Sequence, residues 1–265
     1  MHKRKIYLPL EMFDGYSIGL FMNWVNASVL DDIKYILTNN FCIDSQTIQD
    51  KIFKDIVEEE SADSRYSLQE LSKILRLCAH YTNCDHFALL LVGYQKKFAE
   101  SLCVSALLGQ HSNNLEEALT QAVKHQQLDV KGISLTMNIE SRYVHLIMSI
   151  DENSDLCMRQ IYAFKMAKAF TFLSKITAQQ WKPTQVHFSF RRPEKISSWR
   201  DFFGKNLYFD SEYNGFIFDK EQLHLDINHK NPQICSIIDN YLKLSGQIPL
   251  NNKIEQIKSI IRSSC

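Results

Sequence analysis

The sequence predicts an α+β fold in which a helical amino-terminal subdomain precedes an antiparallel sheet crossed by a long helix. Up to about residue 110, apolar residues recur at helical spacing; from Ile133 onward they alternate with polar ones, as in strands. A long amphipathic stretch and further short strands follow, and two more amphipathic stretches close the chain. We therefore expect a helical subdomain over 1–110, an α+β subdomain over 111–230, and carboxyl-terminal exit helices over 231–265.

Capping residues mark the helix starts in the first half of the chain. Ser28 stands before an apolar face at helical spacing, with Asp31 three residues after it. Ser67 and Glu70 form a capping box in front of a second helix. Asn114 precedes a third helix, which leads up to the first predicted strand.

The strand pattern begins after residue 132. Residues 133–139 and 144–150 alternate apolar and polar side chains, and the turn at 140–142 joins them as an antiparallel pair. A long amphipathic helix is predicted from Asp155 to about Gln179, and Pro183 breaks it.

Two further strand signals follow that helix. Val186, Phe188 and Phe190 alternate with polar residues and predict a third strand. Asn214-Gly215 lies between the apolar triplets 207–209 and 216–218, which predicts a β-hairpin joining them.

The last predicted helices carry apolar faces. Pro232 opens the first of them, and Ile254, Ile257 and Ile261 form a narrow stripe on the second. Such a stripe packs either on the parent core, which we favour slightly, or against a partner chain.

Composition limits the classes of function that we expect for this chain. The 30 basic and 30 acidic residues cancel, which argues against unaided binding to a phosphate backbone. Seven cysteines, an odd number without a CxxC pair, are typical of free thiols in a reducing cytosol. No signal-peptide pattern and no membrane-length apolar run occurs, so a cytoplasmic protein without membrane contact is expected.

The sequence holds none of the common catalytic, cofactor or metal motifs. It lacks a G-x-S-x-G elbow, a P-loop, an H-E-x-x-H pair and a dinucleotide fingerprint, so we expect no enzyme, no cofactor and no metal. His80 and His86 lie six residues apart with Cys84 between them, a spacing that fits a helix end and its loop better than a metal site.

Two histidines are candidate ligand-binding residues. His145 and His187 each fall on a predicted strand, on the face opposite the large apolar side chains. They are either solvent-facing strand residues, which we favour, or the polar lining of a pocket, and metal ligation is a remote third alternative. An enzyme using both with an acidic residue such as Glu140 is a remote alternative, since no motif orients a base toward a nucleophile.

The second candidate group is basic and aromatic. Arg191, Arg192, Arg200 and Lys205 are interleaved with Phe190, Trp199, Phe202 and Phe203. The favoured interpretation is a helical turn anchored on the sheet by its aromatic residues. A carboxylate site for a small ligand is the next, because arginine matches carboxylates, and nucleic-acid stacking comes last. We take Phe190, Arg191, Trp199 and Phe203 as ligand-binding candidates, beside His145 and His187.

The order of motifs in this region resembles a known family. The run Trp181-Lys-Pro-Thr-Gln-Val-His-Phe-Ser-Phe-Arg-Arg-Pro is followed by Trp199-Arg-Asp-Phe-Phe-Gly, Leu207-Tyr-Phe and Asn214-Gly-Phe-Ile-Phe. This series resembles the amino-terminal ligand-binding domain of AraC/XylS-type transcription regulators, in the arabinose-binding-domain branch that also covers ornithine-utilisation-like regulators. The resemblance spans roughly 28–244.

Two positions depart from the family pattern. Phe190 stands where the family usually has His, and Asn206 stands where it usually has Pro. If that His touches the inducer in relatives, the ligand of this chain is less polar or held differently. In relatives the chain continues into a double helix-turn-helix domain, and this sequence stops just before it.

The resemblance implies a ligand-sensing, regulatory and dimerising domain without catalysis. A small-molecule effector, a homodimer and DNA contact only through a further domain are the expected partners. The alternative is a stand-alone module that forms mixed dimers with a full-length regulator.

Overall fold

The computed structural model describes residues 24–26, 28–54, 65–94, 108–126, 133–150, 158–228, 236 and 240. The predicted exit helices and the Ile254, Ile257 and Ile261 stripe thus lie outside the described residues, apart from the helical positions 236 and 240.

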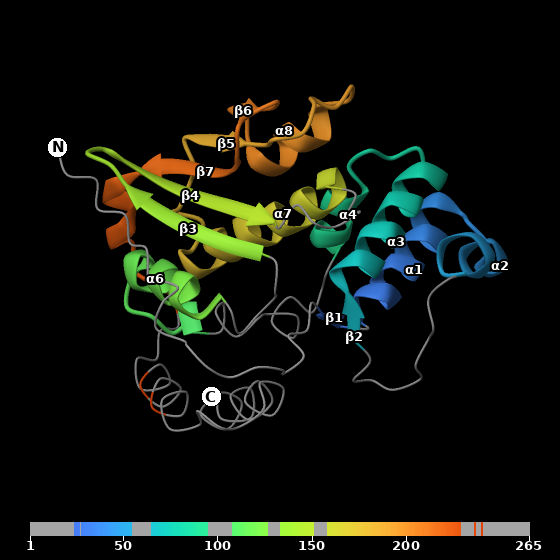
Figure 1. Ribbon diagram of the computed structural model, residues 1–265, viewed down its shortest axis with the longest axis horizontal. Coiled ribbons are helices and arrows are strands. Elements are labelled where there is room, and N and C mark those ends of the chain that lie inside the picture. Colours follow the sequence, from blue (N-terminus) through green and yellow to red (C-terminus); the bar gives the residue numbers. More distant parts are fainter. Residues whose placement is uncertain are drawn as a thin grey trace, which may run out of the picture.

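Figure 1 labels the elements. In chain order they are β1 (Trp24–Asn26), α1 (Ser28–Phe41), α2 (Ser45–Thr47), η2 (Ile48–Ile52), β2 (Arg65–Ser67), α3 (Leu68–Tyr81), α4 (Phe87–Tyr94), α6 (Leu115–His125), β3 (Ile133–Ile139), β4 (Tyr143–Ile150), α7 (Met158–Ile176), β5 (Gln185–His187), α8 (Ser197–Phe203), β6 (Leu207–Tyr208), β7 (Asn214–Asp219) and η4 (Lys220–His224).

The amino-terminal part is helical, as its periodicity predicts. Helices α1, α3 and α4 form a group beside the sheet (Figure 1), and their apolar faces bury Ile33, Leu71 and Leu91 completely. The short antiparallel pair β1–β2 lies at one end of this group, and the sequence pattern does not predict it. Strands of three residues are too short to show an alternating pattern.

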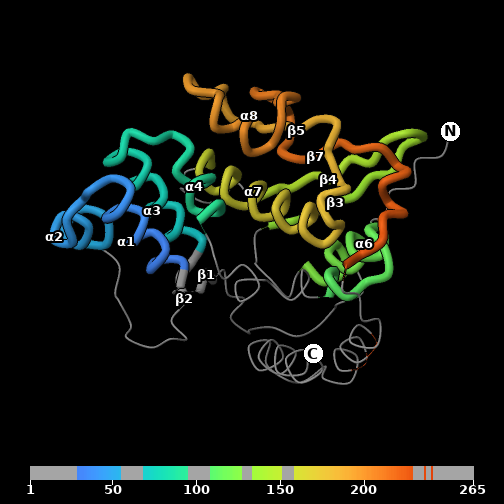
Figure 2. The backbone as a smooth tube through the Cα atoms, turned by 180° about the vertical axis from the view of Figure 1, so that it is seen from behind, coloured from blue at the N-terminus to red at the C-terminus, as the bar shows by residue number. Residues whose placement is uncertain are grey.

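The second part is built on a five-stranded sheet of order β3-β4-β7-β5-β6. All neighbouring strands are antiparallel except β5 and β6, which are parallel. Helix α7 lies along one face of this sheet, as the view from behind shows (Figure 2). The α+β class, with its helical front and a sheet crossed by a long helix, is confirmed.

The strand registers separate the two faces of the sheet. On the inner face, toward α7, Val144 pairs with Phe218, Leu146 with Phe216, and Phe216 with Val186. On the outer face, His145 pairs with Ile217 and Ile217 with Gln185. The larger apolar side chains of these strands therefore face α7, while His145, Gln185 and also the buried Ile217 face away from it.

The predicted hairpin around Asn214-Gly215 is wrong. Strand β6 pairs with β5, and β7 lies between β4 and β5, so β6 and β7 are not neighbours. Asn214 instead accepts a hydrogen bond from Ser189 N through Oδ1 (2.9 Å) and donates one to Ser189 Oγ (2.8 Å). A Cβ on Gly215 would lie 2.4 Å from the Leu146 carbonyl oxygen, so glycine is required by close approach to β4 and not by a turn.

Gly204 ends helix α8 in a conformation that suits glycine alone. Its φ is +94° and its N–H donates to the Arg200 carbonyl at 2.9 Å. A Cβ at this position would meet no atom within 4 Å. We expect Gly204→Ala to lower the free energy of unfolding by about 1–3 kcal/mol through backbone strain alone, measured by urea denaturation. An unchanged midpoint would show that the backbone relaxes to another conformation.

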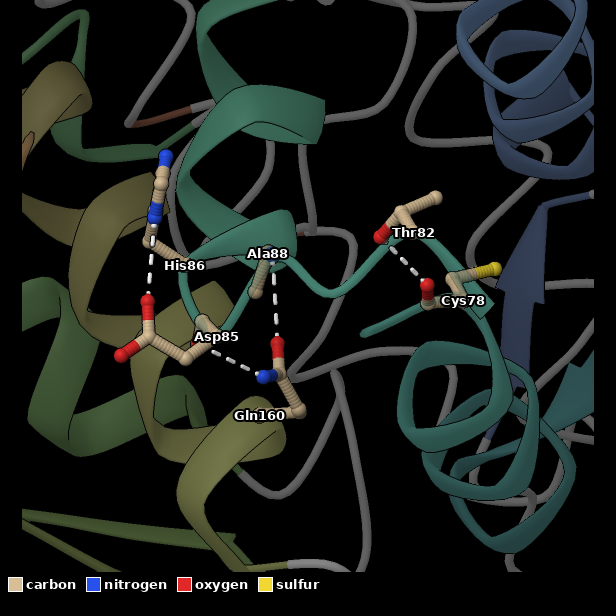
Figure 3. Close-up of polar contacts among 6 residues, drawn as sticks. All are labelled: Cys78, Thr82, Asp85, His86, Ala88 and Gln160. Atoms are coloured by element: carbon tan, nitrogen blue, oxygen red, sulfur yellow. Dashed lines mark hydrogen bonds and ion pairs between the residues drawn. The ribbon is translucent and has the colours of Figure 1, made fainter. Parts of the chain in front are cut away.

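A buried glutamine joins helix α7, which covers the sheet, to helix α4 of the amino-terminal group. Gln160, near the start of α7, is 3% exposed. Its Oε1 accepts from the Ala88 N–H in the first turn of α4 (3.2 Å), and its Nε2 donates to the Asp85 carbonyl (2.8 Å) (Figure 3). The first N–H groups of a helix have no partner within the helix, so Gln160 serves as a cap supplied by another element. Helix α7 is thereby fixed to α4 at one end while it lies along the sheet.

Candidate functional site

The predicted ligand-binding residues lie on two sides of the sheet. His145 on β4 and His187 on β5 belong to the outer face. Phe190, Trp199 and Phe203 lie on the inner side, in contact with the ring of Phe188. Arg191 follows Phe190 at the surface. They therefore do not form a single site, and each side is described by itself.

His187 is held between two tyrosine rings on the outer face. Its ring stacks on Tyr208 at 4.8 Å and on Tyr213 at 4.9 Å. Its Nε2 lies 2.9 Å from Gln185 Oε1, and its Nδ1 lies 3.1 Å from Ser211 Oγ. Because a carbonyl oxygen only accepts, the neutral ring carries its proton on Nε2 and accepts from the Ser211 hydroxyl. Both ring nitrogens are thus already engaged.

His145 approaches the same region from β4, although β7 separates β4 from β5. Its side chain is 24% exposed, and its Nε2 lies 3.7 Å from Glu140 Oε2. Burial, together with the nearby carboxylates of Glu140 and Glu212, raises the pKa of Tyr213. Glu140 therefore acts electrostatically on Tyr213 beside His145 on the outer face.

Protonation of His187 is disfavoured in the folded protein. Burial, and secondly the charge of His145, lower the pKa of His187. A lowered folded pKa means that His187 contributes stability above about pH 6.5, its unfolded value, and that this contribution is lost as the pH falls below it. We expect His145→Gln to raise the pKa of His187, measured by NMR titration of the ring protons. A pKa unchanged by that substitution would leave burial as the sole cause.

The inner side is occupied by a continuous group of rings, which we name the aromatic layer. It runs from the middle strands across α7 to α8 and consists of Phe170, Trp181, Phe188, Phe190, Trp199, Phe202, Phe203, Phe209, Phe216 and Phe218. Ring-centroid distances within it are 4.8–6.3 Å, and edge-to-face contacts are frequent. Phe170 of α7 touches both ends of the layer, through Trp181 and Phe203.

Both tryptophans of the aromatic layer are buried with an unsatisfied N–H. Trp181 is 1% exposed and Trp199 is 0% exposed. Within the part of the chain that the structure describes, neither indole Nε1 has a hydrogen-bond partner. Buried indole N–H groups usually find an acceptor, so the two are unusual.

Arginine side chains lie at the edge of the aromatic layer near Phe190. The guanidinium carbon of Arg159 lies 5.8 Å from the centroid of the Phe190 ring, and its Nη2 donates to the Arg191 carbonyl at 3.4 Å. Arg191 itself is exposed. The predicted Arg191 is therefore accompanied by a second arginine, Arg159 from α7, which no sequence pattern indicated.

The structure also bears on the metal and membrane expectations. Among the described residues, no group of three or more histidine, cysteine or acidic side chains is placed to hold a metal ion. Of the helices described, none is long and apolar enough to cross a membrane.

Comparison with known proteins identifies the family of this chain. Residues 55–227 match the family model described as the arabinose-binding domain of AraC transcription regulators, amino-terminal, which is well over half of the sequence. The chain belongs to this family. The match includes the sheet, α7 and α8, and it confirms the resemblance seen in the order of motifs from Trp181 to Phe218.

The chain is similar to a solved structure of a transcription regulator. That structure shows the transcriptional regulator CdpR from Pseudomonas aeruginosa, with 14% sequence identity and a TM-score of 0.49. The similarity covers 65% of this chain and 54% of that one, so the chain spans about half the length of the regulator. No curated protein matches the sequence.

Several residues of the two regions could not be identified from the sequence. Tyr208 and Tyr213 flank His187 from different segments, and only the parallel pairing of β5 with β6 brings Tyr208 beside it. Arg159 lies 31 positions before Phe190 in the sequence. The signal that the sequence does carry for this region is the density of aromatic residues between Phe188 and Phe209.

Proposed function

We propose that this chain is the effector-sensing and regulatory part of an AraC-type transcription regulator, that it dimerises, and that it works without catalysis. Membership of the arabinose-binding-domain family over residues 55–227 is the observation that carries the proposal. The effector is a small molecule, the natural location is the cytoplasm, and DNA is contacted through a further domain.

The way the two parts are joined supports a regulatory role. Helix α7 covers the inner face of the sheet and is bonded through Gln160 to the start of α4. A ligand that favours one position of α7 on the sheet would therefore also favour one position of the helical group. A ligand that binds one of two conformations more tightly shifts the equilibrium toward that conformation, and in this way couples two distant parts of a protein.

The geometry of the histidines supports a role other than catalysis. The Ser211 hydroxyl donates to His187 Nδ1, but His187 Nε2 donates to the neutral amide of Gln185 and not to a carboxylate that would stabilise a protonated ring. His145 lies beside Glu140, across β7 from His187. The Ser211–His187 contact therefore has a neutral amide where a catalytic triad has a carboxylate, which favours a role in fixing side chains on the sheet surface.

Native mass spectrometry of the chain purified from its host tests the proposal. Spectra under gentle and then denaturing conditions are expected to show a dimer that releases a small molecule. A dimer without a ligand would favour the mixed-dimer module over the sensor. A monomer without a ligand would contradict both sensing and dimerisation by this chain.

A further inference from the structure

The indole N–H of Trp199 is the starting point. Trp199 is fully buried on α8, and among the residues described its Nε1 has no hydrogen-bond partner. A buried donor without an acceptor is costly, and folded proteins satisfy the great majority of such groups. A ligand bearing an oxygen acceptor would remove this cost on binding.

The aromatic rings around Trp199 do not supply a good acceptor. Its ring contacts Phe188, Phe190, Phe203 and Phe209 at centroid distances of 5.3–6.3 Å. An aromatic face accepts an N–H only weakly compared with a carbonyl or carboxylate oxygen. The same rings form an apolar environment in which another aromatic ring can pack edge-to-face or stacked.

The edge of this cluster is both accessible and positively charged. Phe190 and Phe209 are only partly buried, whereas Phe188 and Trp199 are fully buried. Arg159 lies over the Phe190 ring, and the exposed Arg191, Arg192 and Lys195 follow along the same connection, with Glu194 as the acidic residue among them. An anionic ligand is attracted to such an edge.

We propose that the part of the aromatic layer around Trp199 is the effector site and that the effector is an aryl carboxylate. Its ring packs among Phe188, Phe190 and Phe209, a carboxylate oxygen accepts from Trp199 Nε1–H, and Arg159 balances the charge. Binding requires Phe190 and Phe209, the partly buried rings, to turn aside. The inference rests on the proposed sensing function and adds the site and the chemical class.

Trp181 provides a contrast within the same layer. Its N–H is equally buried and unpartnered among the described residues. However, its ring contacts Phe170, Phe216 and Phe218, beneath the middle strands of the sheet. It therefore lies away from the Arg159 edge, and we place it in the core rather than in the site.

Calorimetric titration of the full chain with phenylacetate tests the inference. Trp199→Phe is expected to weaken binding about tenfold or more, because it removes a hydrogen bond to a charged group and keeps an aromatic ring. Trp181→Phe is the matched control and should leave the dissociation constant within about twofold. Arg159→Gln, at a half-exposed position, should also weaken binding about tenfold, and the surface variant Arg142→Gln should not.

Three results would overturn the inference. The first is no binding of phenylacetate by the unmodified chain at millimolar concentration. The second is equal binding of the neutral phenylethanol, which would exclude the carboxylate. The third is loss of binding in His187→Gln with Trp199→Phe unaffected, which would move the site to the outer face. Each leaves the sensing function intact if native mass spectrometry still finds a retained molecule, so the two proposals fail separately.

Discussion

Replacing Gly215 by alanine is expected to lower the free energy of unfolding by about 3 kcal/mol. The new Cβ would lie 2.4 Å from the Leu146 carbonyl oxygen and 3.1 Å from the Ile147 Cα. Both are backbone atoms of β4, so no side chain can turn aside to relieve the contact. Strands β4 and β7 must separate locally, at the centre of the sheet. Urea denaturation followed by circular dichroism measures the effect.

Gly93 supplies the matched control for this substitution. It lies near the end of α4, and a Cβ there would meet no atom within 4 Å. Because alanine favours a helix over glycine by about 1 kcal/mol, Gly93→Ala should leave stability unchanged or raise it slightly. Equal losses in the two variants would contradict the close-approach explanation for Gly215.

Replacing Gln160 by methionine is expected to cost about 2–5 kcal/mol of unfolding free energy, because two buried backbone groups lose their partner. Methionine keeps the length and the packing volume of glutamine. It cannot accept from the Ala88 N–H or donate to the Asp85 carbonyl, the two bonds shown in Figure 3. Chemical denaturation gives the loss in stability, and amide hydrogen exchange at Ala88 locates it.

Gln222 allows a control with the same chemistry at the surface. Its Oε1 accepts from Lys182 N (2.8 Å), and its Nε2 donates to the Lys182 carbonyl (2.9 Å). Water can replace both bonds there, so Gln222→Met should cost less than about 1 kcal/mol. Similar losses at Gln160 and Gln222 would show that burial does not determine the cost.

The Gln160 substitution also connects stability to the proposed function. If α7 transmits effector binding from the sheet to the helical group, Gln160→Met should weaken the coupling without altering the aromatic cluster around Trp199. The expected result is unchanged affinity for the effector together with reduced exchange protection of α4 in the bound state. Affinity lost in parallel with stability would instead make Gln160 a purely structural residue.

Two elements show which features of the fold the sequence predicts correctly. The Asn114 cap is confirmed, because its side chain accepts from Glu117 N at 2.9 Å. The pair β3–β4 has the predicted strands and the predicted turn, closed by the Glu140 N–H donating to Tyr143 O at 2.9 Å. Both features depend on residues close in the chain, where propensity and periodicity act directly.

The hairpin at Asn214-Gly215 failed for a physical reason. Asparagine and glycine favour a tight turn, but they also serve where a strand packs too closely for a Cβ and where a buried backbone N–H needs a side-chain acceptor. Here Gly215 meets the β4 backbone and Asn214 bonds to Ser189. Only the insertion of β5 between β6 and β7 distinguishes these roles, and strand order is not a local property.

The sequence by itself therefore determined the class of fold, the starts of α1, α3 and α6, the two faces of β3 and β4, and the family. These follow from periodicity, capping chemistry and the order of motifs, which are read along the chain. Tertiary structure decided which candidates lie together: it stacked Tyr208 and Tyr213 on His187 and brought Arg159 over Phe190. Such contacts join residues distant in sequence, so they depend on how strands and helices pack and not on any local pattern.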